Sequence, residues 1–490
     1  MTHGEAPGTT LDTDVIVVGA GPAGLTTAME VAASGAKVTI LEKRGEPALS
    51  RAGVVQPRVL EFFAMRGLAE QMIAKGKELN GIKHRNNVGI WAGLPGVNYN
   101  LLDGEYNWIL VLSQIEVERI LAARCVELGV EIRRNAAVTA VTQDAGSVTA
   151  TYVENGVEKT ATAKYLVGAD GGRSAVRESL GLAWTGTEAR NLAVNVDAEL
   201  PFPFPADGKT VVINTTAGWG LCYPLSEQVT RFAVIDAQTM LGVGRDYVVD
   251  EESAFQSLER VFGSDYGRPK ARISQFHDAL FRIETIRRGR VALVGESTRI
   301  HYPASGVGMN FAIQDAANLG WKIAAEVQGW GPENVIDSYE TERGPAIDDH
   351  LDNVRSQTAI QFRFDEETVA LKDTVMNDIL PVPEAQKVIA ARLAGFSTHY
   401  GDGTGLVGGR IGDQPLIGGG RLFDAIDASG YTLVQPAGAA AVQGGKHLAV
   451  VQAEIPGAEG EHVLVRPDGY VDFVGDAPAV AVRIQELRLL

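Results

Sequence analysis

The first clear pattern in the chain is a strand, a turn, a helix and a second strand near the N-terminus. Residues 15–18 are all Val or Ile, as expected for a strand buried on both faces of a sheet. Residues 25–34 are rich in Ala, Leu, Met and Glu and predict a helix that ends at Gly35. A second apolar strand is predicted over residues 37–41, followed by Glu42. This succession predicts a βαβ unit in an α/β domain.

Glycines at a fixed spacing fill the turn of this unit, which reads Gly19-x-Gly21-x-x-Gly24. Gly19 allows the tight turn, Gly21 lets the backbone approach a pyrophosphate, and Gly24 lets helix and strand pack closely. The helix N-terminus supplies free N–H groups for the phosphates. Glu42 stands 18 residues after Gly24, where its carboxylate can accept the ribose hydroxyls of an adenosine. A turn that served packing alone would not require this acid, so the pattern predicts a dinucleotide site.

The charge of Glu42 bears on which dinucleotide binds. It disfavours a 2′-phosphate by repulsion, although Lys43 and Arg44 follow it directly. FAD and NAD both remain open on these residues alone.

A second stretch places an acidic turn after a buried strand. Residues 165–168 predict the strand, which runs into Asp170, two glycines and a helix start with Ser and two Arg. This arrangement is unusual for a plain loop, and we expect it to face a nucleotide and its phosphates.

A third stretch begins with a predicted strand over residues 291–294 that ends at Gly295 and Glu296. A loop with Pro303, Gly306 and Gly308 then leads to a helix from about residue 310. These glycines permit close backbone approach to a flat ligand, and the helix start directs N–H groups toward it. His301 in this loop is typical of an ordinary loop histidine, with a catalytic base as the alternative.

The remaining pattern predicts two further modules. Residues 190–250 alternate apolar and polar positions, which predicts a mostly antiparallel sheet with one wet or ligand-facing side. Residues 357–394 predict helices. The glycine-dense stretch 401–419 predicts a linker or long loop, and short strands with an end helix after it predict a small α/β domain.

Composition limits the classes of protein that remain. The 490 residues predict two or three domains, and 45% hydrophobic with 21% charged residues are typical of soluble globular proteins. The net charge of −17 disfavours a nucleic-acid partner. Two isolated cysteines, Cys125 and Cys222, exclude a disulfide framework or a cysteine-rich metal site, so we expect no metal and a cytoplasmic location. No signal peptide or membrane span is expected.

Three ordered motifs carry a resemblance to a known family. They read GAGPAG over residues 19–24 with Glu42, GADGGRSAVR over 168–177, and GESTRIHYPASGVGMN over 295–310. They resemble the FAD-dependent aromatic hydroxylases with the para-hydroxybenzoate hydroxylase fold, the group A flavoprotein monooxygenases, over about residues 12–350. With the C-terminal part, which includes VRPDGYV over 465–471, the chain is similar to hydroxylases that tailor aromatic polyketides and to phenol-hydroxylase and rifampicin-monooxygenase relatives.

The resemblance implies a fold and its division. It implies a Rossmann-type FAD-binding domain with an inserted, mostly antiparallel substrate sheet and a C-terminal thioredoxin-like domain without redox cysteines. The FAD-binding domain would comprise residues 1–180, with some substrate-domain strands at 80–110, and 286–395 with long helices. Residues 181–285 would form the substrate domain and 400–490 the thioredoxin-like domain.

The resemblance also implies cofactors and the residues near them. FAD would be bound, NADPH or NADH would bind transiently without a dedicated domain, and O₂ would be the co-substrate. Arg51 is the candidate polar group near the reacting oxygen. The candidate FAD-binding residues are Gly19, Gly21, Ala23, Gly24, Glu42, Lys43, Arg44, Arg51, Gln114, Asp170, Gly295, Glu296, Pro303, Gly306, Gly308, Met309 and Asn310.

The third motif departs from the family pattern. Glu296 stands where the family usually has Asp, and its extra methylene moves the carboxylate by about 1.5 Å. Arg299 holds the position of the motif's first His, Tyr302 replaces the first of two prolines, and Val307 replaces a common Gln. Because the glycines and Asn310 remain, these changes indicate a retuned flavin pocket.

The implied function is a monooxygenase that inserts one oxygen atom of O₂ into a polycyclic, polyketide-type aromatic through a flavin C4a-(hydro)peroxide, in antibiotic or other secondary metabolism. Trp219, Tyr223, Phe232 and Phe276 could line its substrate cavity, with core packing as the alternative for each. Baeyer–Villiger or rearrangement chemistry, drug inactivation and flavin binding without turnover remain open, as does assembly into a homodimer.

Overall fold

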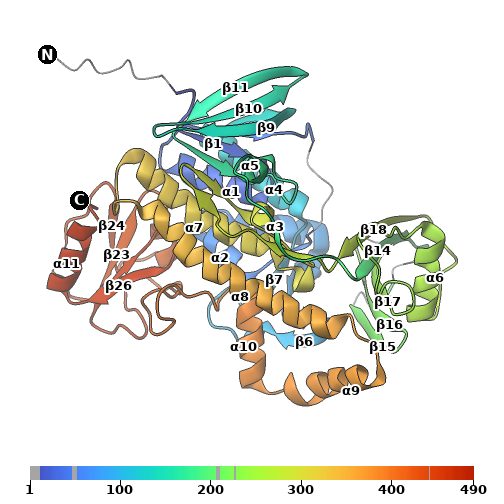
Figure 1. The fold of residues 1–490 in the computed structure, drawn as a ribbon. Coiled ribbons are helices and arrows are strands. Elements are labelled where there is room, and N and C mark those ends of the chain that lie inside the picture. Colours follow the sequence, from blue (N-terminus) through green and yellow to red (C-terminus); the bar gives the residue numbers. More distant parts are fainter. Residues whose placement is uncertain (1–10, 47–51, 203, 206–209, 226–227, 441) are drawn as a thin grey trace.

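The computed structural model describes residues 11–46, 52–202, 204–205, 210–225, 228–440 and 442–490. Its largest sheet has six strands in the order β20-β21-β12-β1-β2-β8, and Figure 1 labels β1 of this sheet. Its strands are β1 (Val15–Val18), β2 (Val38–Glu42), β8 (Glu131–Arg134), β12 (Tyr165–Gly168), β20 (Arg287–Arg288) and β21 (Val291–Leu293).

The centre of this sheet is where its connections change direction. β1 pairs in parallel with β2 on one side and with β12 on the other. Since β12 also pairs in parallel with β21, the carboxyl ends of four neighbouring strands meet at one edge. In open α/β sheets the crevice at such a switch point is where ligands bind. The fold therefore brings the three sequence motifs to one place.

Helix α1 (Pro22–Ala33) packs against β1 and β2, and helices α4 (Gln114–Glu127) and α7 (Gly308–Gln328) pack against α1. The packing of α1 against α7 depends on Gly320, because a Cβ at that position would lie 2.4 Å from the Cβ of Glu30. Further helices of this part are α2 (Pro57–Ala64), α3 (Ala69–Asn80) and α5 (Ala175–Ser179), and a hairpin sheet is formed by β9 (Ala136–Gln143), β10 (Val148–Glu154) and β11 (Val157–Ala163).

A five-stranded sheet with the order β15-β16-β17-β14-β18 forms a separate module, and all its pairings are antiparallel, as predicted. Its strands are β14 (Leu192–Glu199), β15 (Val211–Thr215), β16 (Gly218–Pro224), β17 (Val229–Asp236) and β18 (Ala271–His277). Helix α6 (Glu251–Phe262) covers one face of this sheet. The other face is left to meet the rest of the protein.

Short strands connect this module to the six-stranded sheet. One three-stranded sheet consists of β13 (Thr185–Thr187), β19 (Leu280–Arg282) and β22 (Arg299–Ile300), and another of β3 (Val54–Val55), β4 (Arg85–Asn86) and β7 (Ile109–Val111). The hairpin of β5 (Val88–Trp91) and β6 (Leu94–Asn98) lies within the predicted 80–110 region. Helices α8 (Ser338–Gln361), α9 (Glu366–Thr374) and α10 (Pro383–Ala394) follow α7 in the chain.

The C-terminal module is a four-stranded mixed sheet with one helix, at the opposite end of the molecule from the antiparallel sheet (Figure 1). Its elements are β23 (Tyr431–Gln435), β24 (Leu448–Gln452), β25 (His462–Val465), β26 (Val471–Gly475) and α11 (Ala477–Glu486). A small α/β unit was expected here from the sequence. Its likeness to thioredoxin and the domain boundaries stay predictions.

The stretch of residues 465–471 fixes the C-terminal module to the rest. Arg466 forms a two-bonded ion pair with Glu342 of α8 at 2.7 and 2.9 Å and also binds Asp468. The carbonyl of Asp468 accepts a hydrogen bond from Arg58 of α2 at 2.7 Å. Attraction to Arg466 and Lys322 outweighs burial and holds the pKa of the Glu342 carboxyl well below its usual value. These buried contacts join α2, α7 and α8 to the C-terminal sheet.

Candidate cofactor and substrate site

The glycine turn after β1 has the geometry that a bound pyrophosphate needs. Gly19 has a φ of +104°, and a Cβ at Gly24 would lie 2.0 Å from the carbonyl oxygen of Gly19. No atom lies within 4 Å of a Cβ built on Gly21, so the backbone there is open on that side. Helix α1 begins with Pro22 and has no side-chain cap, so its first N–H groups are available to an anion.

Glu42 ends β2 beside this turn, as the sequence predicted. It is 3% exposed, and its Oε2 accepts the N–H of Ala20 at 2.7 Å. Its Oε1 accepts from the backbone N–H of Arg44 at 2.8 Å and from the Arg44 side chain at 3.1 Å. The carboxylate is thereby fixed at the strand end, and Oε2, which accepts a single hydrogen bond, keeps a second lone pair for a ribose hydroxyl. Lys43 is exposed to solvent.

Asp170 lies at the end of β12, next to the glycine turn. Its Cα is 3.3 Å from the position of a Cβ on Gly19. Oδ2 accepts from the N–H of Val176 at 3.2 Å, whereas Oδ1 is buried and finds no hydrogen-bond partner among the described residues. Burial raises the pKa of this carboxyl, against the hydrogen bonds that lower it. A buried acceptor without a donor is costly, so this oxygen fits a ligand hydroxyl.

Gly295 and Glu296 follow β21 at the same edge. Gly295 has a φ of +67°, and a Cβ there would lie 3.3 Å from the Cβ of Ala23 in α1. Glu296 is exposed, and its Oε2 lies 4.0 Å from the position of a Cβ on Gly171. The second and third motifs are therefore adjacent in space, on the far side of the glycine turn from Glu42.

Residues 301–307, here called the cofactor loop, lead into α7. The amide of Asn310 accepts the N–H of Gln56 at 2.7 Å and donates to the carbonyls of Val54 and Gly306. Gly306 needs a φ of +67°, and a Cβ on it would lie 3.1 Å from Val54. Asn310 thus holds the N-terminus of α7 against β3, while Pro303 is exposed and Met309 partly buried.

Gln114 begins α4 on the Glu42 side of the cleft. Its Nε2 donates to Glu118 at 2.8 Å, and burial raises the pKa of that carboxyl. Helix α4 has no side-chain cap, although Ser113 precedes it. Arg51, the candidate for the reacting oxygen, lies outside the described residues.

Arg299 does not turn toward the cleft. Its Nη1 binds Asp315 of α7 at 2.6 Å, and its guanidinium carbon lies 4.5 Å from the centre of the Phe311 ring. The residue is 2% exposed. At this position the departure from the family pattern forms a buried ion pair with Asp315. The side chain of Arg299 therefore gives no support to the retuned flavin pocket that we expected from the sequence.

His301 contacts a second histidine. Its Nδ1 lies 2.8 Å from the Tyr302 carbonyl oxygen, which can only accept, and its Nε2 lies 3.2 Å from Nε2 of His350 in α8. Burial lowers the pKa of His301 to about 4 and that of His350 well below its usual value. Both rings are therefore neutral at pH 7, with the His350 N–H donating to His301.

The antiparallel sheet presents three of the four predicted aromatic residues on one face. Trp219 and Tyr223 point to the same side of β16, because their positions differ by an even number of residues. The strand register places Phe276 of β18 on that same face. The ring of Phe276 lies 5.6 Å from that of Tyr302 in the cofactor loop. Phe232 lies on the opposite face, fully buried, 5.3 Å from the ring of Phe262 in α6. The structure thus places Phe232 in the core, the alternative weighed for it.

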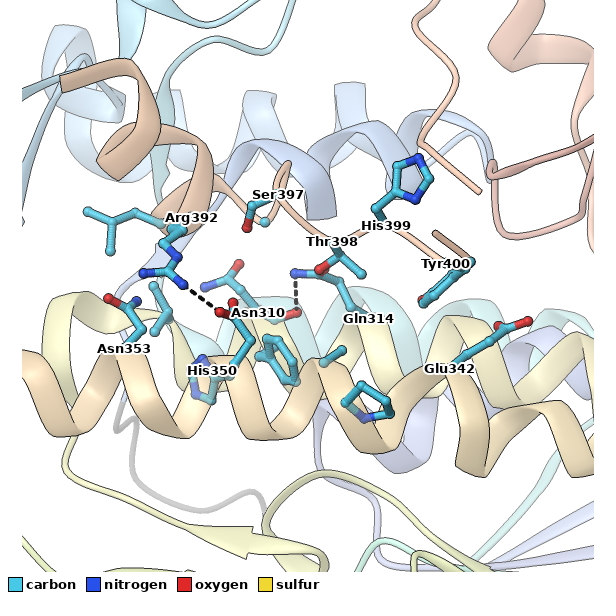
Figure 2. Close-up of a pocket in the computed structure, with 18 of the residues that line it drawn as sticks. Asn310, Gln314, Glu342, His350, Asn353, Arg392, Ser397, Thr398, His399 and Tyr400 are labelled. Carbon is cyan, nitrogen blue, oxygen red and sulfur yellow. Dashed lines mark hydrogen bonds and ion pairs between the residues drawn. The ribbon is translucent and has the colours of Figure 1, made fainter. Parts of the chain in front are cut away.

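A cavity of about 220 Å³ lies behind the N-terminal half of α7, between α7, α8 and α10. Figure 2 shows Gln314 of α7, His350 of α8 and Arg392 of α10 around it, with residues 397–400 on the remaining side. Asn310 lines this cavity and also binds Val54 of β3 beside the cofactor loop. No sequence pattern predicted this cavity.

The residues at the sheet edge fit a dinucleotide. The open side of Gly21, the uncapped N-terminus of α1 and the unpartnered oxygen of Asp170 lie together at this edge. Among the described residues no cluster of His, Cys, Asp or Glu could hold a metal ion. No helix in the described part of the chain is long and apolar enough to cross a membrane.

Comparison with known proteins decides the family. The sequence profile of the FAD binding domain matches residues 12–354. The chain belongs to this FAD-binding family. The flavoprotein is also 34% identical to a rifampicin monooxygenase of Streptomyces venezuelae, over 94% of this chain and 96% of that one.

Solved structures agree with this result. The anhydrotetracycline hydroxylase of Streptomyces rimosus superimposes with a TM-score of 0.84 at 30% identity, over 98% of this chain and 99% of that chain. The expected aromatic-hydroxylase fold is thereby confirmed. The flavoprotein is an FAD-dependent monooxygenase with NAD(P)H as electron donor and O₂ as co-substrate. A dialkyldecalin synthase of Streptomyces rugosporus is 28% identical over 93% of this chain and 95% of that one.

One buried residue near the site was missed by the sequence reasoning. Gln357 of α8 is fully buried, and its Oε1 accepts from Ser305 of the cofactor loop at 2.6 Å and from the N–H of Ala92 at 2.9 Å. The only sequence signal was a pair of amides, Asn353 and Gln357, four residues apart, which is the spacing of neighbours on one face of a helix.

Proposed function

We propose that this flavoprotein hydroxylates a polycyclic aromatic substrate of the polyketide type, held between the open face of the antiparallel sheet and the cofactor loop. The contact of Phe276 with Tyr302 carries the proposal, because it brings the sheet to the loop where the cofactor's ring system would end. Trp219 and Tyr223 extend the same aromatic face. The names of the rifampicin and anhydrotetracycline relatives support a polycyclic substrate from secondary metabolism.

The cofactor would be held by residues of the sheet edge. The turn of Gly19, Gly21, Ala23 and Gly24 with the α1 N-terminus would bind the pyrophosphate, and Glu42 the adenosine ribose. Asp170 and Glu296 would accept hydroxyls of the ribityl chain. Lys43 and Arg44 would border the adenosine side, and Gln114 would lie near the flavin. Gly295, Pro303, Gly306, Gly308, Met309 and Asn310 would border the isoalloxazine side.

Bound FAD supplies electron transfer from NAD(P)H and the activation of O₂. The protein residues would do the remaining work. Phe276 and Tyr302 would orient the substrate ring and exclude water from the reacting atoms. Arg51 would be the polar group nearest the reacting oxygen. The neutral His301 would not add a positive charge beside the loop at pH 7.

Partners and compartment belong to the same proposal. The net charge of −17 supports an enzyme that works without nucleic acid, and two isolated cysteines support the reducing cytoplasm. A homodimer is the assembly we propose, to be measured by light scattering of the purified protein.

NADPH oxidation by the purified holoprotein tests the function. We expect polycyclic phenols and naphthoquinones, offered as a panel, to stimulate NADPH consumption and to yield a product one oxygen atom heavier by mass spectrometry. A lactone or a cleaved ring in the product would show that the reaction is a Baeyer–Villiger oxidation and not a hydroxylation. Consumption that no member of the panel stimulates would contradict the proposed substrate class.

A further inference from the structure

One face of α8 binds two segments that border the proposed site. His350, Asn353 and Gln357 lie on this face, and each is at most 6% exposed. His350 contacts His301 at 3.2 Å, and Asn353 accepts from the indole of Trp91 at 3.3 Å. The face therefore contacts both the cofactor loop and the tip of the β5–β6 hairpin, residues 91–94.

Gln357 is where the two segments meet. A single amide oxygen accepts from Ser305 at 2.6 Å and from the N–H of Ala92 at 2.9 Å. Ser305 has a φ of +55° and Ala92 a φ of +52°, which non-glycine residues seldom adopt. Such conformations persist where the surroundings fix them. The Gln357 oxygen binds the side-chain hydroxyl of Ser305 and the backbone N–H of Ala92, so it is part of these surroundings at both residues.

The hairpin tip continues this chain of contacts to the antiparallel sheet. The indole N–H of Trp219 donates to the carbonyl oxygen of Gly93 at 2.9 Å. Gly93 has a φ of +78°, and a Cβ there would lie 2.6 Å from the Trp219 nitrogen, so the approach is close. Hydrogen bonds and one covalent step thus connect the aromatic face of the sheet to the loop beside the cofactor.

The Gln357 amide acts through its oxygen. Its Nε2 is buried and makes no hydrogen bond to the described residues. Both bonds that join the loop and the hairpin tip are accepted by Oε1. A glutamate at this position would keep an acceptor at the same distance from the backbone, and a methionine would remove it at similar volume.

We propose that Gln357 is a positioning residue that couples the substrate-facing sheet to the cofactor loop. A ligand that shifts Trp219 moves the hairpin tip, and Gln357 passes this movement to Ser305. The inference rests on the proposed function for its biological meaning. Physically, the inference is that Trp219 and residues 302–306 are coupled through the hairpin tip and Gln357, because the hydrogen bonds along this path do not join them directly.

Hydrogen–deuterium exchange on the FAD-loaded protein tests this coupling without a substrate. Trp219→Phe removes the indole donor, and we expect exchange over residues 302–306 to become about fivefold faster, as for the loss of one hydrogen bond. Gln357→Met should speed exchange of the Ala92 amide and of 302–306 by a similar factor. In the double variant, Trp219→Phe should add nothing over 302–306.

Two further variants distinguish the loss of hydrogen bonds from a loss of packing. Gln357→Glu keeps a carbonyl acceptor, because a carboxyl buried here is held in its protonated form, and exchange should stay close to that of the natural protein. A loss of packing alone would not distinguish this variant from Gln357→Met. Ser305→Ala should free residues 302–306 while the Ala92 amide stays protected. The proposal is overturned when Trp219→Phe leaves 302–306 unchanged, or when its effect persists undiminished beside Gln357→Met. Since no substrate is used, these outcomes are independent of the proposed substrate class.

Discussion

Arg299 and Asp315 form an ion pair in the protein interior, with 2.6 Å between Nη1 of the arginine and Oδ2 of the aspartate. The other oxygen of Asp315 binds Arg343 of α8 at 2.8 Å. One carboxylate therefore serves two buried guanidinium groups, from β22 and α8, directly behind the cofactor loop. One of the positions that depart from the family motif, Arg299, is thereby tied to the packing of α7 on α8.

Asp315→Ala should lower the free energy of unfolding by about 3–5 kcal/mol, because two buried guanidinium groups lose their counter-charge. Urea denaturation measures this. Asp352→Ala is the matched control, since Asp352 pairs with Arg355 on the surface of α8, where both side chains are more than half exposed. Its effect should stay below about 1 kcal/mol. Equal losses in the two variants would show that the buried network does not stabilise the fold.

Gly21→Ala should weaken FAD binding at least about tenfold, because the new methyl group would occupy the open side of the backbone where the pyrophosphate approaches. The apoprotein should lose no more than about 1 kcal/mol of stability, because Gly21 is the N-cap of α1, where glycine is preferred to alanine by about that much, while its extended backbone accepts a side chain. Titration of apoprotein with FAD, followed by flavin fluorescence, measures the affinity.

Alanine substitutions at two other glycines serve as controls for this prediction. Gly244→Ala also adds a methyl group into open space and should leave FAD affinity unchanged. Gly24→Ala should destabilise the apoprotein itself, because its Cβ would lie 2.0 Å from a carbonyl oxygen. If the Gly21→Ala variant bound FAD as tightly as the natural protein, the pyrophosphate would not bind at this turn.

The two faces of the antiparallel sheet should respond differently to truncation. Phe276→Ala should raise KM for the aromatic substrate severalfold with little change in stability, since this partly buried ring meets Tyr302 at the proposed site. Phe232→Ala should cost about 3–5 kcal/mol of stability and leave KM nearly unchanged, because its ring is fully buried against α6. The reverse pattern would place the substrate on the α6 face.

The buried histidine pair should make the protein acid-sensitive. In the unfolded chain both rings gain protons near pH 6.5, whereas burial keeps the pKa of His301 at about 4 and that of His350 well below 6.5. The unfolded state therefore binds more protons between these values, and stability should fall as the pH drops from 6.5 toward 4. The slope from the two groups is at most about 2.7 kcal/mol per pH unit.

Urea denaturation at pH 7 and pH 5 measures this slope. His350→Asn removes one of the two titrating rings. The variant should therefore lose less free energy of unfolding between pH 7 and pH 5, by about half of the amount that the two histidines together contribute. An unchanged pH dependence in this variant would mean that other groups cause the acid sensitivity.

The cofactor side of the site could be predicted from sequence because its signals are local. The spacing of Gly19, Gly21 and Gly24 fixes a turn by backbone sterics alone, and Glu42 ends the next strand of the same unit. A parallel sheet then brings the ends of its strands to one edge, so Asp170 and Gly295 join them without further information.

The substrate side could not be predicted to the same depth. Whether Phe232 faces the ligand or α6 depends on strand register, and a shift of one residue reverses every side chain. Arg299 and Asp315 are brought together only by the packing of α7 near β22, and Gln357 acquires its role from two loops far away in sequence. These contacts depend on tertiary structure, which leaves no periodic trace in the chain.

A single turnover under oxygen-18 gas tests the central claim most directly. The FAD-loaded protein would be reduced with NADPH, mixed with a polycyclic phenol that stimulated NADPH consumption and with labelled O₂, and the product analysed by mass spectrometry. The account predicts one oxygen-18 atom in the product, attached to an intact aromatic ring system. A product that carries no label, including a ring-closed isomer of the substrate, would contradict the assignment as a monooxygenase.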